Sequence, residues 1–122
     1  MYIKSYKELI VWQKSMDLAK EIFLLTSQFP KSELYGLVSQ MRRAAVAIPS
    51  NIAEGHGRKS YNEYRHYFSI AYGSVLELET QLLLSKQLNM TAIELFSQGE
   101  KLHTEVAKML NVMTSKKLAS RS

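Results

Sequence analysis

The chain has 122 residues, the size of one domain, and 46% of them are hydrophobic, which is enough for one core. It contains no cysteine, so disulfides and thiolate metal sites are excluded, and this usage favours a cytoplasmic location. No apolar run approaches the ~20 residues of a membrane-spanning helix, so no membrane partner is expected. The net charge of +5 is compatible with binding a polyanion, and equally with simple solubility.

Helical periodicity predicts a first helix over residues 6–28. Two adjacent apolar stripes give it a wide apolar face. One stripe contains Leu9, Trp12, Met16, Ala19 and Phe23, and the other contains Val11, Leu18, Ile22, Leu25 and Phe29. Pro30 ends the segment, because the residue before a proline is disfavoured in helical geometry.

A second helix is predicted over residues 32–55. Its core stripe consists of Leu34, Leu37, Met41, Ala44 or Ala45, Ile48 and Ile52. Pro49 falls inside this stripe and predicts a kink, with Ser50 or Asn51 as a donor to the freed carbonyl. Gly55 and Gly57 are typical of a helix end.

Two further helices are predicted over residues 60–88 and 91–115. Each starts with a capping box, Ser60 with Glu63 and Thr91 with Glu94. The third helix carries one stripe of Tyr61, Tyr64, Phe68, Ala71, Val75, Leu78 and Leu82, and a second stripe of Tyr72, Leu76 and Leu83. The links between helices are short, which forces neighbouring helices to run antiparallel. The sequence therefore predicts an all-α protein, an antiparallel up-down-up-down four-helix bundle over residues 1–115 followed by a flexible basic tail over 116–122.

Two Glu-x-x-His spacings, Glu63 with His66 and Glu100 with His103, are typical of metal sites in helical bundles. Antiparallel packing would place residue 100 level with about residue 79 on the third helix. Glu63 would then lie about 24 Å away along that helix, so the two motifs cannot share one metal. The histidines are scattered and no strained turn displays a serine, so we expect no enzymatic activity and no cofactor.

Basic residues suggest a surface for nucleic acid. Arg58, Lys59 and Arg65 surround the link between the second and third helices, where Tyr61, Tyr64 and Tyr67 are interleaved. Cations neutralise phosphates and aromatic rings stack on unpaired bases. The alternative is that Tyr61 and Tyr64 belong to the core. Further candidate cations are Arg42 and Arg43 on the second helix and Lys116 and Lys117 in the tail.

A polar stripe on the second helix points away from the predicted core. It consists of Gln40, Arg43, Ser50 and Glu54, with Ala47 as the one interruption. One interpretation is an ordinary solvated face. The other is an interface with a second subunit, because small alanines flank the stripe and the apolar faces of the first and third helices are wider than one bundle needs.

The second helix resembles the signature of a bacterial four-helix-bundle family encoded in intervening sequences of 23S rRNA genes, sometimes described as ribosomal-protein-like. The resemblance covers roughly residues 6–110. It rests on Gln40 to Ala45, on Ile48 to Gly55 (with Ser50, Asn51 and Glu54), on Leu9, Val11, Trp12 and Gln13, on Phe29, Pro30, Glu33, Tyr35, Gly36 and Leu37, and on Gly73, Ser74, Glu77, Leu78 and Glu79. At Ala47 the family often has a serine.

The resemblance implies a ring-shaped homopentamer without enzymatic activity. The family is similar to the accessory variability determinant of diversity-generating retroelements, which associates with nucleic acid and a reverse transcriptase. The first hypothesis is therefore an oligomeric scaffold that binds RNA or DNA. The alternatives are a protein-interaction module, docking a partner such as a reverse transcriptase, and a metal-binding bundle.

Overall fold

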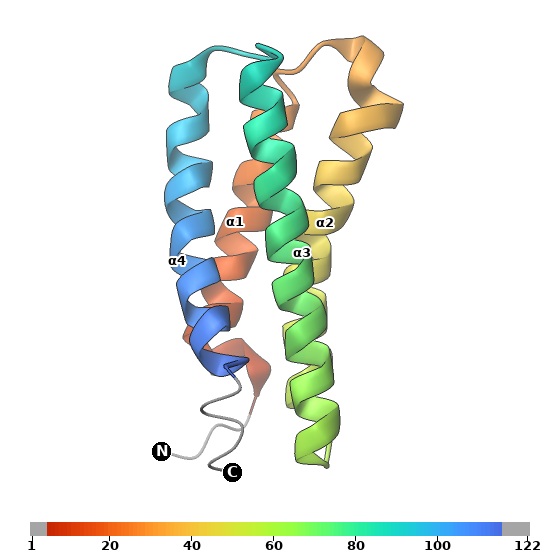
Figure 1. Ribbon diagram of the computed structural model, residues 1–122, viewed down its shortest axis with the longest axis vertical. Helices are drawn as coiled ribbons and strands as arrows, with labels where there is room; N and C mark the ends of the chain where they lie inside the picture. Colours follow the sequence, from red (N-terminus) through yellow and green to blue (C-terminus); the bar gives the residue numbers. More distant parts are fainter. Residues whose placement is uncertain (1–4, 116–122) are drawn as a thin grey trace.

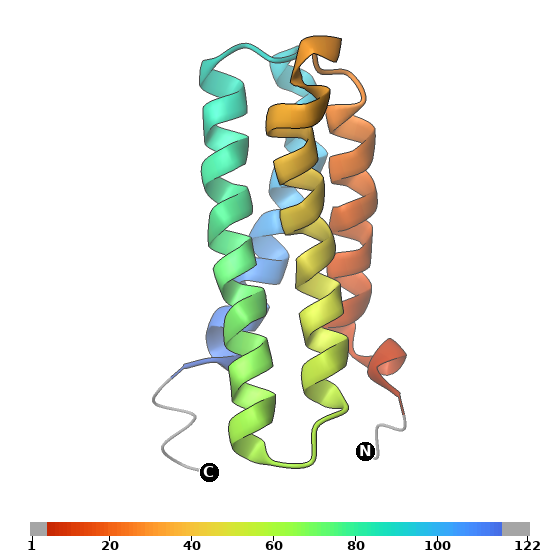
Figure 2. The ribbon, with the colours of Figure 1, turned by 90° about the vertical axis from the view of Figure 1, so that its right-hand side faces the viewer.

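Four long helices form an antiparallel up-down-up-down bundle in the computed structural model, which describes residues 5–115 (Figure 1). Each helix packs against the two that precede and follow it around the bundle (Figure 2). The helices are α1 (Ile10–Thr26), α2 (Ser39–His56), α3 (Tyr61–Gln87) and α4 (Ser97–Met113). Residues 5–115 contain no strand, which confirms the predicted all-α fold. The predicted basic tail lies outside the described residues.

Short irregular turns extend three of the four helices. A 3-10 turn, η1 (Tyr6–Glu8), precedes α1 and is separated from it by Leu9 in extended backbone. Two turns precede α2, the 3-10 turn η2 (Lys31–Glu33) and the π-helical turn η3 (Leu34–Val38). A fourth turn, η4 (Ile93–Phe96), leads into α4. Helices α1, α2 and α4 therefore start later than predicted, because the segments before them form 3-10 or π-helical turns.

The break in the second helical segment lies at Gly36 and not at Pro49. Gly36 has φ −112° and ψ −109°, a conformation that glycine reaches because it has no Cβ. Helix α2 continues through Pro49, whose ring is buried. Asn51 Nδ2 donates to the carbonyl of Ala47 at 2.8 Å, so Asn51 bonds to the backbone as expected but to a different carbonyl from the one that Pro49 frees.

One of the two predicted capping boxes provides a cap. Ser60 Oγ accepts a hydrogen bond from the Glu63 amide at 3.1 Å and starts α3. The prediction for Thr91 is wrong, because Ala92 occupies the N-cap position of η4 and makes no side-chain bond. Asn89 turns the chain with a φ of 55°, and Ala92 is still extended before the turn begins.

The core is formed by one apolar stripe from each helix. In α1 the second predicted stripe is buried, from Val11 to Phe29, whereas Met16 and Phe23 of the first stripe are exposed. In α3 the stripe from Phe68 to Leu82 is buried, whereas Leu76 and Leu83 of the second stripe are exposed. Part of the wide apolar face predicted on α1 and on α3 is therefore exposed on the surface of the bundle. None of the described helices has the length and apolarity to cross a bilayer.

Candidate nucleic-acid interface

The α2–α3 hairpin extends beyond the other two helices at one end of the bundle (Figures 1 and 2). Helix α3 has 27 residues, whereas α1 and α4 have 17 each. The end of this hairpin, residues 54–67, is called the hairpin tip below. The C-terminal end of α4, after which the chain continues to Lys116 and Lys117, points toward the same end because α4 runs antiparallel to α3 (Figure 1). Those two predicted cations themselves lie outside the described residues.

Close packing of α2 on α3 at Gly55 shapes the hairpin tip. A Cβ placed on Gly55 would lie 2.8 and 2.9 Å from two ring carbons of Phe68 and 3.0 Å from Cβ of Tyr67. Real Cβ atoms do not approach other atoms so closely, so the Phe68 ring can pack against the backbone of α2 here because residue 55 is glycine. The sequence interpretation of Gly55 as a helix end missed this contact.

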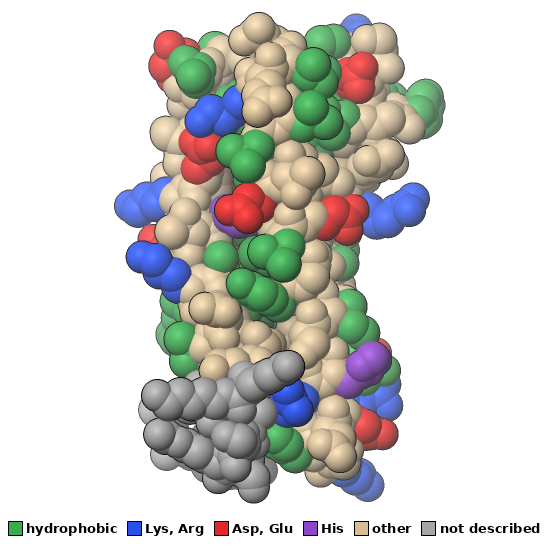
Figure 3. Space-filling view, in the orientation of Figure 1, with side chains coloured by type: hydrophobic (Ala, Val, Ile, Leu, Met, Phe, Trp, Pro, Cys, Tyr) green, Lys and Arg blue, Asp and Glu red, His purple; other side chains and the backbone are tan. Residues whose placement is uncertain are grey.

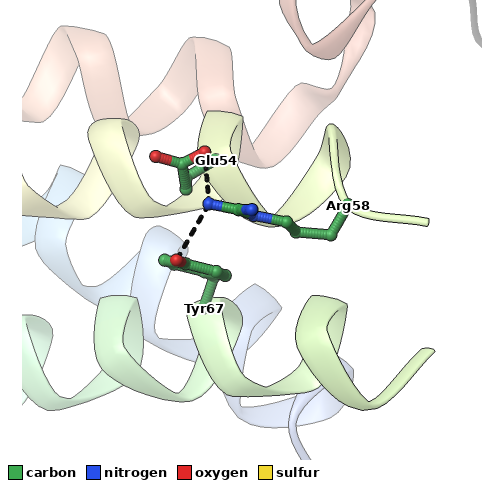
Figure 4. Close-up of polar contacts among 3 residues, drawn as sticks. All are labelled: Glu54, Arg58 and Tyr67. Carbon is green, nitrogen blue, oxygen red and sulfur yellow. Dashed lines mark hydrogen bonds and ion pairs between the residues drawn. The ribbon is translucent and has the colours of Figure 1, made fainter. Parts of the chain in front are cut away.

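Arg58 is held on the surface of the tip by two side chains (Figure 4). Its Nη2 atom donates to Glu54 Oε2 at 3.0 Å and to the Tyr67 hydroxyl at 2.9 Å. The guanidinium carbon also lies 4.7 Å from the centre of the Tyr67 ring. These contacts orient the guanidinium while more than a third of the side chain stays exposed.

The other two cations of the tip differ in exposure. Lys59 is exposed and has no polar partner in residues 5–115. Arg65 is half-buried, and its Nε atom has no hydrogen-bond partner in the described part of the chain. Glu54 and Glu63 lie at the same tip, but Glu54 pairs with Arg58. In Figure 3, basic, acidic and histidine side chains lie together at the right of this lower end of the molecule.

A stack of three aromatic rings runs from the core to the tip. Phe68 is fully buried, Tyr64 is half-buried and Tyr61 is exposed. The ring centres of Tyr64 and Phe68 are 4.3 Å apart, and those of Tyr61 and Tyr64 are 6.0 Å apart. Burial, and then the neighbouring Tyr61, raises the pKa of Tyr64 above its ordinary value of 10.0, so its hydroxyl stays neutral at physiological pH. The core interpretation of these tyrosines therefore holds for Tyr64 more than for Tyr61.

Arg42 and Arg43 do not join the tip. They lie about 24 Å from Arg58 along α2 at the helical rise of ~1.5 Å per residue. Arg42 Nε donates to Thr26 Oγ1 at 3.0 Å, and its Nη2 donates to the carbonyl of Phe23 at 3.3 Å. Arg42 thus ties α2 to the C-terminal turn of α1. Arg43 is exposed and makes no polar contact within residues 5–115.

The polar stripe of α2 faces outward, as its spacing predicted. Gln40, Arg43, Ser50 and Glu54 are all exposed. Two other motif residues lie on α3, where Ser74 is half-buried and Glu77 is exposed and accepts a hydrogen bond from Gln81 Nε2 at 3.2 Å. The stripe is therefore accessible along its length.

An apolar groove between α1 and α2 adjoins this stripe at Ser50. It has a volume of about 470 Å³. Its lining includes Trp12, Met16, Phe23, Val46 and Pro49. The groove was not predicted from the sequence. The first apolar stripe of α1 could have indicated it, because Met16 and Phe23 of that stripe are exposed and line the groove.

Of the two Glu-x-x-His spacings, Glu100 with His103 is occupied by side-chain contacts, whereas Glu63 contributes its backbone amide to a helix cap. Glu63 belongs to the cap of α3, and His103 Nε2 lies 2.9 Å from the carbonyl of Val75. Glu100 binds Lys86 Nζ at 2.9 Å. Glu79 and Glu100 line the same small cleft, which confirms the predicted register of α3 and α4. Within residues 5–115 no three histidine or carboxylate side chains are placed to hold a metal ion.

Comparisons with known proteins identify relatives of this architecture. A crystal structure of a protein of unknown function from the S23 ribosomal protein family of Bacteroides thetaiotaomicron VPI-5482 has a similar fold, with a TM-score of 0.77 at 21% sequence identity. The similarity covers 88% of this chain and 100% of the other. No curated protein matches. The family model described as 23S rRNA-intervening sequence protein matches residues 7–112. This chain therefore belongs to the family of 23S rRNA-intervening sequence proteins.

Proposed function

We propose that this chain is a non-enzymatic, cytoplasmic, self-associating scaffold that binds nucleic acid, RNA or DNA, through its hairpin tip. The observation that carries the proposal is the position of Arg58, Lys59 and Arg65 on a hairpin end that extends past α1 and α4. A protruding basic surface can approach a phosphate backbone without a clash from the rest of the bundle. Arg58 is also oriented before it binds, which lowers the entropy cost of a phosphate contact.

Binding of this kind is governed by counterion release and should depend strongly on salt. Three phosphate contacts on a duplex predict a slope of about −2.7 for the logarithm of the association constant against the logarithm of salt concentration. A mobility-shift assay with labelled structured RNA and duplex DNA at several salt concentrations measures this slope.

A matched pair of variants separates the tip from general charge. The double variant Arg58→Gln, Lys59→Gln should reduce the magnitude of the slope by about 2, since each lost phosphate contact reduces it by about 1. The control Lys101→Gln, Lys108→Gln removes the same charge from exposed positions on α4 and should bind as the wild type does. Failure to retain either probe at low ionic strength, or equal losses in both double variants, would contradict the proposal.

Self-association is the second part of the proposal, and the outward face of α2 supports it. The exposed stripe Gln40, Arg43, Ser50 and Glu54 borders the apolar groove, so polar and apolar contacts lie side by side. An interface with this composition would cover the apolar side chains that line the groove. The pentamer implied by the family resemblance is the expected assembly.

Light scattering coupled to gel filtration tests the assembly. The wild type should elute with a mass about five times the 14.0 kDa of one chain. Val46→Glu places a charge in the groove and should yield the monomer, whereas Val112→Glu, the same change at an exposed position on α4, should not. A wild-type monomer at micromolar concentration would refute this part.

A second candidate function, docking of a protein such as a reverse transcriptase, is favoured by the end of the bundle opposite the tip. Large apolar side chains are exposed there on η3, η4 and the end of α3, namely Leu34, Tyr35, Leu88, Ile93 and Leu95. Figure 3 shows hydrophobic side chains over this upper end. Several exposed apolar side chains at one end of a protein, in contrast to isolated ones, are typical of a protein-binding site.

Affinity capture after nuclease treatment tests the docking function. The triple variant Leu34→Ser, Tyr35→Ser, Ile93→Ser should lose any protein that the wild type retains, and the tip variant Arg58→Gln, Lys59→Gln should keep it. Retention of nothing but the chain itself by the wild type would eliminate this candidate.

A further inference from the structure

The exposed ring of Tyr61 ends the aromatic stack at the hairpin tip. Tyr61 is 44% exposed, and within residues 5–115 its one ring contact is with Tyr64, at an interplanar angle of 19°. Tyr64 in turn lies nearly parallel to Phe68, at 23°. Since Phe68 is fully buried, the stack is anchored in the core and presents its outermost ring at the surface.

No other helix covers this ring. Glu79 and Glu100 lie at the same height, so Met113, the last residue of α4, is level with about residue 66 of α3. Tyr61 lies more than one helical turn beyond that level. Within residues 5–115, α4 therefore ends before it could pack over the position that continues the core stripe of α3.

Two cations belong to the same hairpin tip as the ring. Lys59 is two residues before Tyr61 and is exposed, and Arg58 is fixed over the ring of Tyr67 on the neighbouring face of α3. A flat aromatic face next to positive charge matches a nucleotide whose base is unpaired, because the base stacks on the ring while the phosphate contacts the cations. The bases of a duplex are already stacked on each other and do not offer this contact.

We infer that Tyr61 is a stacking platform for an unpaired base, and that the hairpin tip prefers single-stranded nucleic acid to duplex. This inference rests on the proposed function and adds the form of nucleic acid that the tip recognises. Because Tyr61 stacks on Tyr64, which in turn stacks on the buried Phe68, its ring is held in place before a base binds. Little conformational entropy is therefore lost when a base stacks on it.

Fluorescence anisotropy with four labelled probes tests the inference. The probes are a 12-nucleotide oligouridine, the matching oligothymidine, an abasic backbone with the same number of phosphates, and a 12-base-pair duplex. The wild type should bind the two base-bearing strands most tightly. Tyr61→Leu should weaken binding to these strands by about 5- to 150-fold, the range for one stacked base, and should leave abasic binding unchanged. A loss on either strand supports the inference, and the strand with the larger loss distinguishes RNA from DNA as the ligand.

Control variants separate stacking from folding and from charge. Tyr61→Trp keeps an aromatic face and should bind the strands at least as tightly as the wild type. Tyr35→Leu is the same change as Tyr61→Leu at an exposed tyrosine of the opposite end and should have no effect. If Tyr61→Leu binds all probes as the wild type does while Arg58→Gln, Lys59→Gln binds more weakly, stacking is refuted and the proposed function stands. An equal loss on the abasic backbone also refutes stacking. If the wild type retains no probe, the proposed function fails and the inference with it.

Discussion

The two ends of the bundle differ in backbone, in surface and in the use of arginine. At the hairpin tip the helices are regular, α3 starts at a side-chain cap, and the surface carries cations and aromatic rings. At the opposite end the chain passes through a π-turn and two 3-10 turns, and the surface carries large apolar side chains. Arg58 is exposed at the first end, whereas Arg42 binds the backbone of α1 near the second.

This difference lies in the surface chemistry of the two ends and not in whether each end has a packed core. Both ends contain a fully buried phenylalanine, Phe68 towards the tip and Phe96 at the opposite end. Phe96 contacts Phe29 with ring centres 6.2 Å apart, and Phe68 stacks more closely on Tyr64, at 4.3 Å. The chemistry exposed at each end therefore varies over a core that is continuous along the bundle.

The largest effect is expected from removing these two phenylalanines. Phe68→Ala and Phe96→Ala should each lower the free energy of unfolding by about 3–5 kcal/mol, because each leaves a cavity in a packed core. Urea denaturation followed by circular dichroism measures both. A loss below about 1 kcal/mol in one of them would show that its end is loosely packed and would break the comparison.

Gly55 is expected to show the next largest effect. A Cβ at this position overlaps the Phe68 ring, so Gly55→Ala should destabilise the chain by about 1–3 kcal/mol despite the better helix propensity of alanine. Gly73→Ala is the matched control. No atom lies within 4 Å of a Cβ there, so that change should stabilise the chain by about 0.5–1 kcal/mol. Stabilisation by both changes would show that the α2–α3 contact relaxes at no cost.

Arg42 should behave as a structural residue in the same measurements. Arg42→Gln removes the guanidinium that binds Thr26 Oγ1, the Phe23 carbonyl and the face of the Phe23 ring, so we expect a loss of about 1–2 kcal/mol. Arg43→Gln, at the next position, should stay within about 0.5 kcal/mol of the wild type because Arg43 is exposed. Equal effects would remove the distinction between the two arginines.

The structure could be predicted best from the sequence where a single helical period of apolar residues runs through a segment. The helix count, the antiparallel order, the Ser60 cap, the buried stripe of α3 from Phe68 to Leu82 and the outward face of α2 all follow from spacing that the bundle preserves. Sequence reasoning also placed Glu79 level with Glu100, because rise per residue and short links determine register.

The remaining features depend on contacts between segments that are distant in sequence. Two adjacent apolar stripes on α1 have the same period, and only packing against α2 and α4 decides that the stripe containing Leu18 is buried while Met16 lines a groove. The same holds for Gly55, where the approach of Phe68 is a property of the α2–α3 pair. Arg42 and Arg58 have identical side chains, so charge alone could not distinguish a tie to α1 from an exposed cation.

The smallest effect on stability is expected from the ion pair of Arg58 with Glu54. Measuring the strength of this pair tests whether Arg58 is available to bind a phosphate. Exposed pairs of this kind contribute about 0.2–1 kcal/mol. A double-mutant cycle with Arg58→Gln and Glu54→Gln should give a coupling energy in that range, and the coupling should shrink in 1 M salt, where the screening length falls to about 3 Å. A coupling energy above about 2 kcal/mol that resists salt would mean that Arg58, like Arg42, is a structural tie. The contrast between the two ends would then rest on Lys59 and Tyr61, because Arg58 would be committed to Glu54 and unavailable to a phosphate.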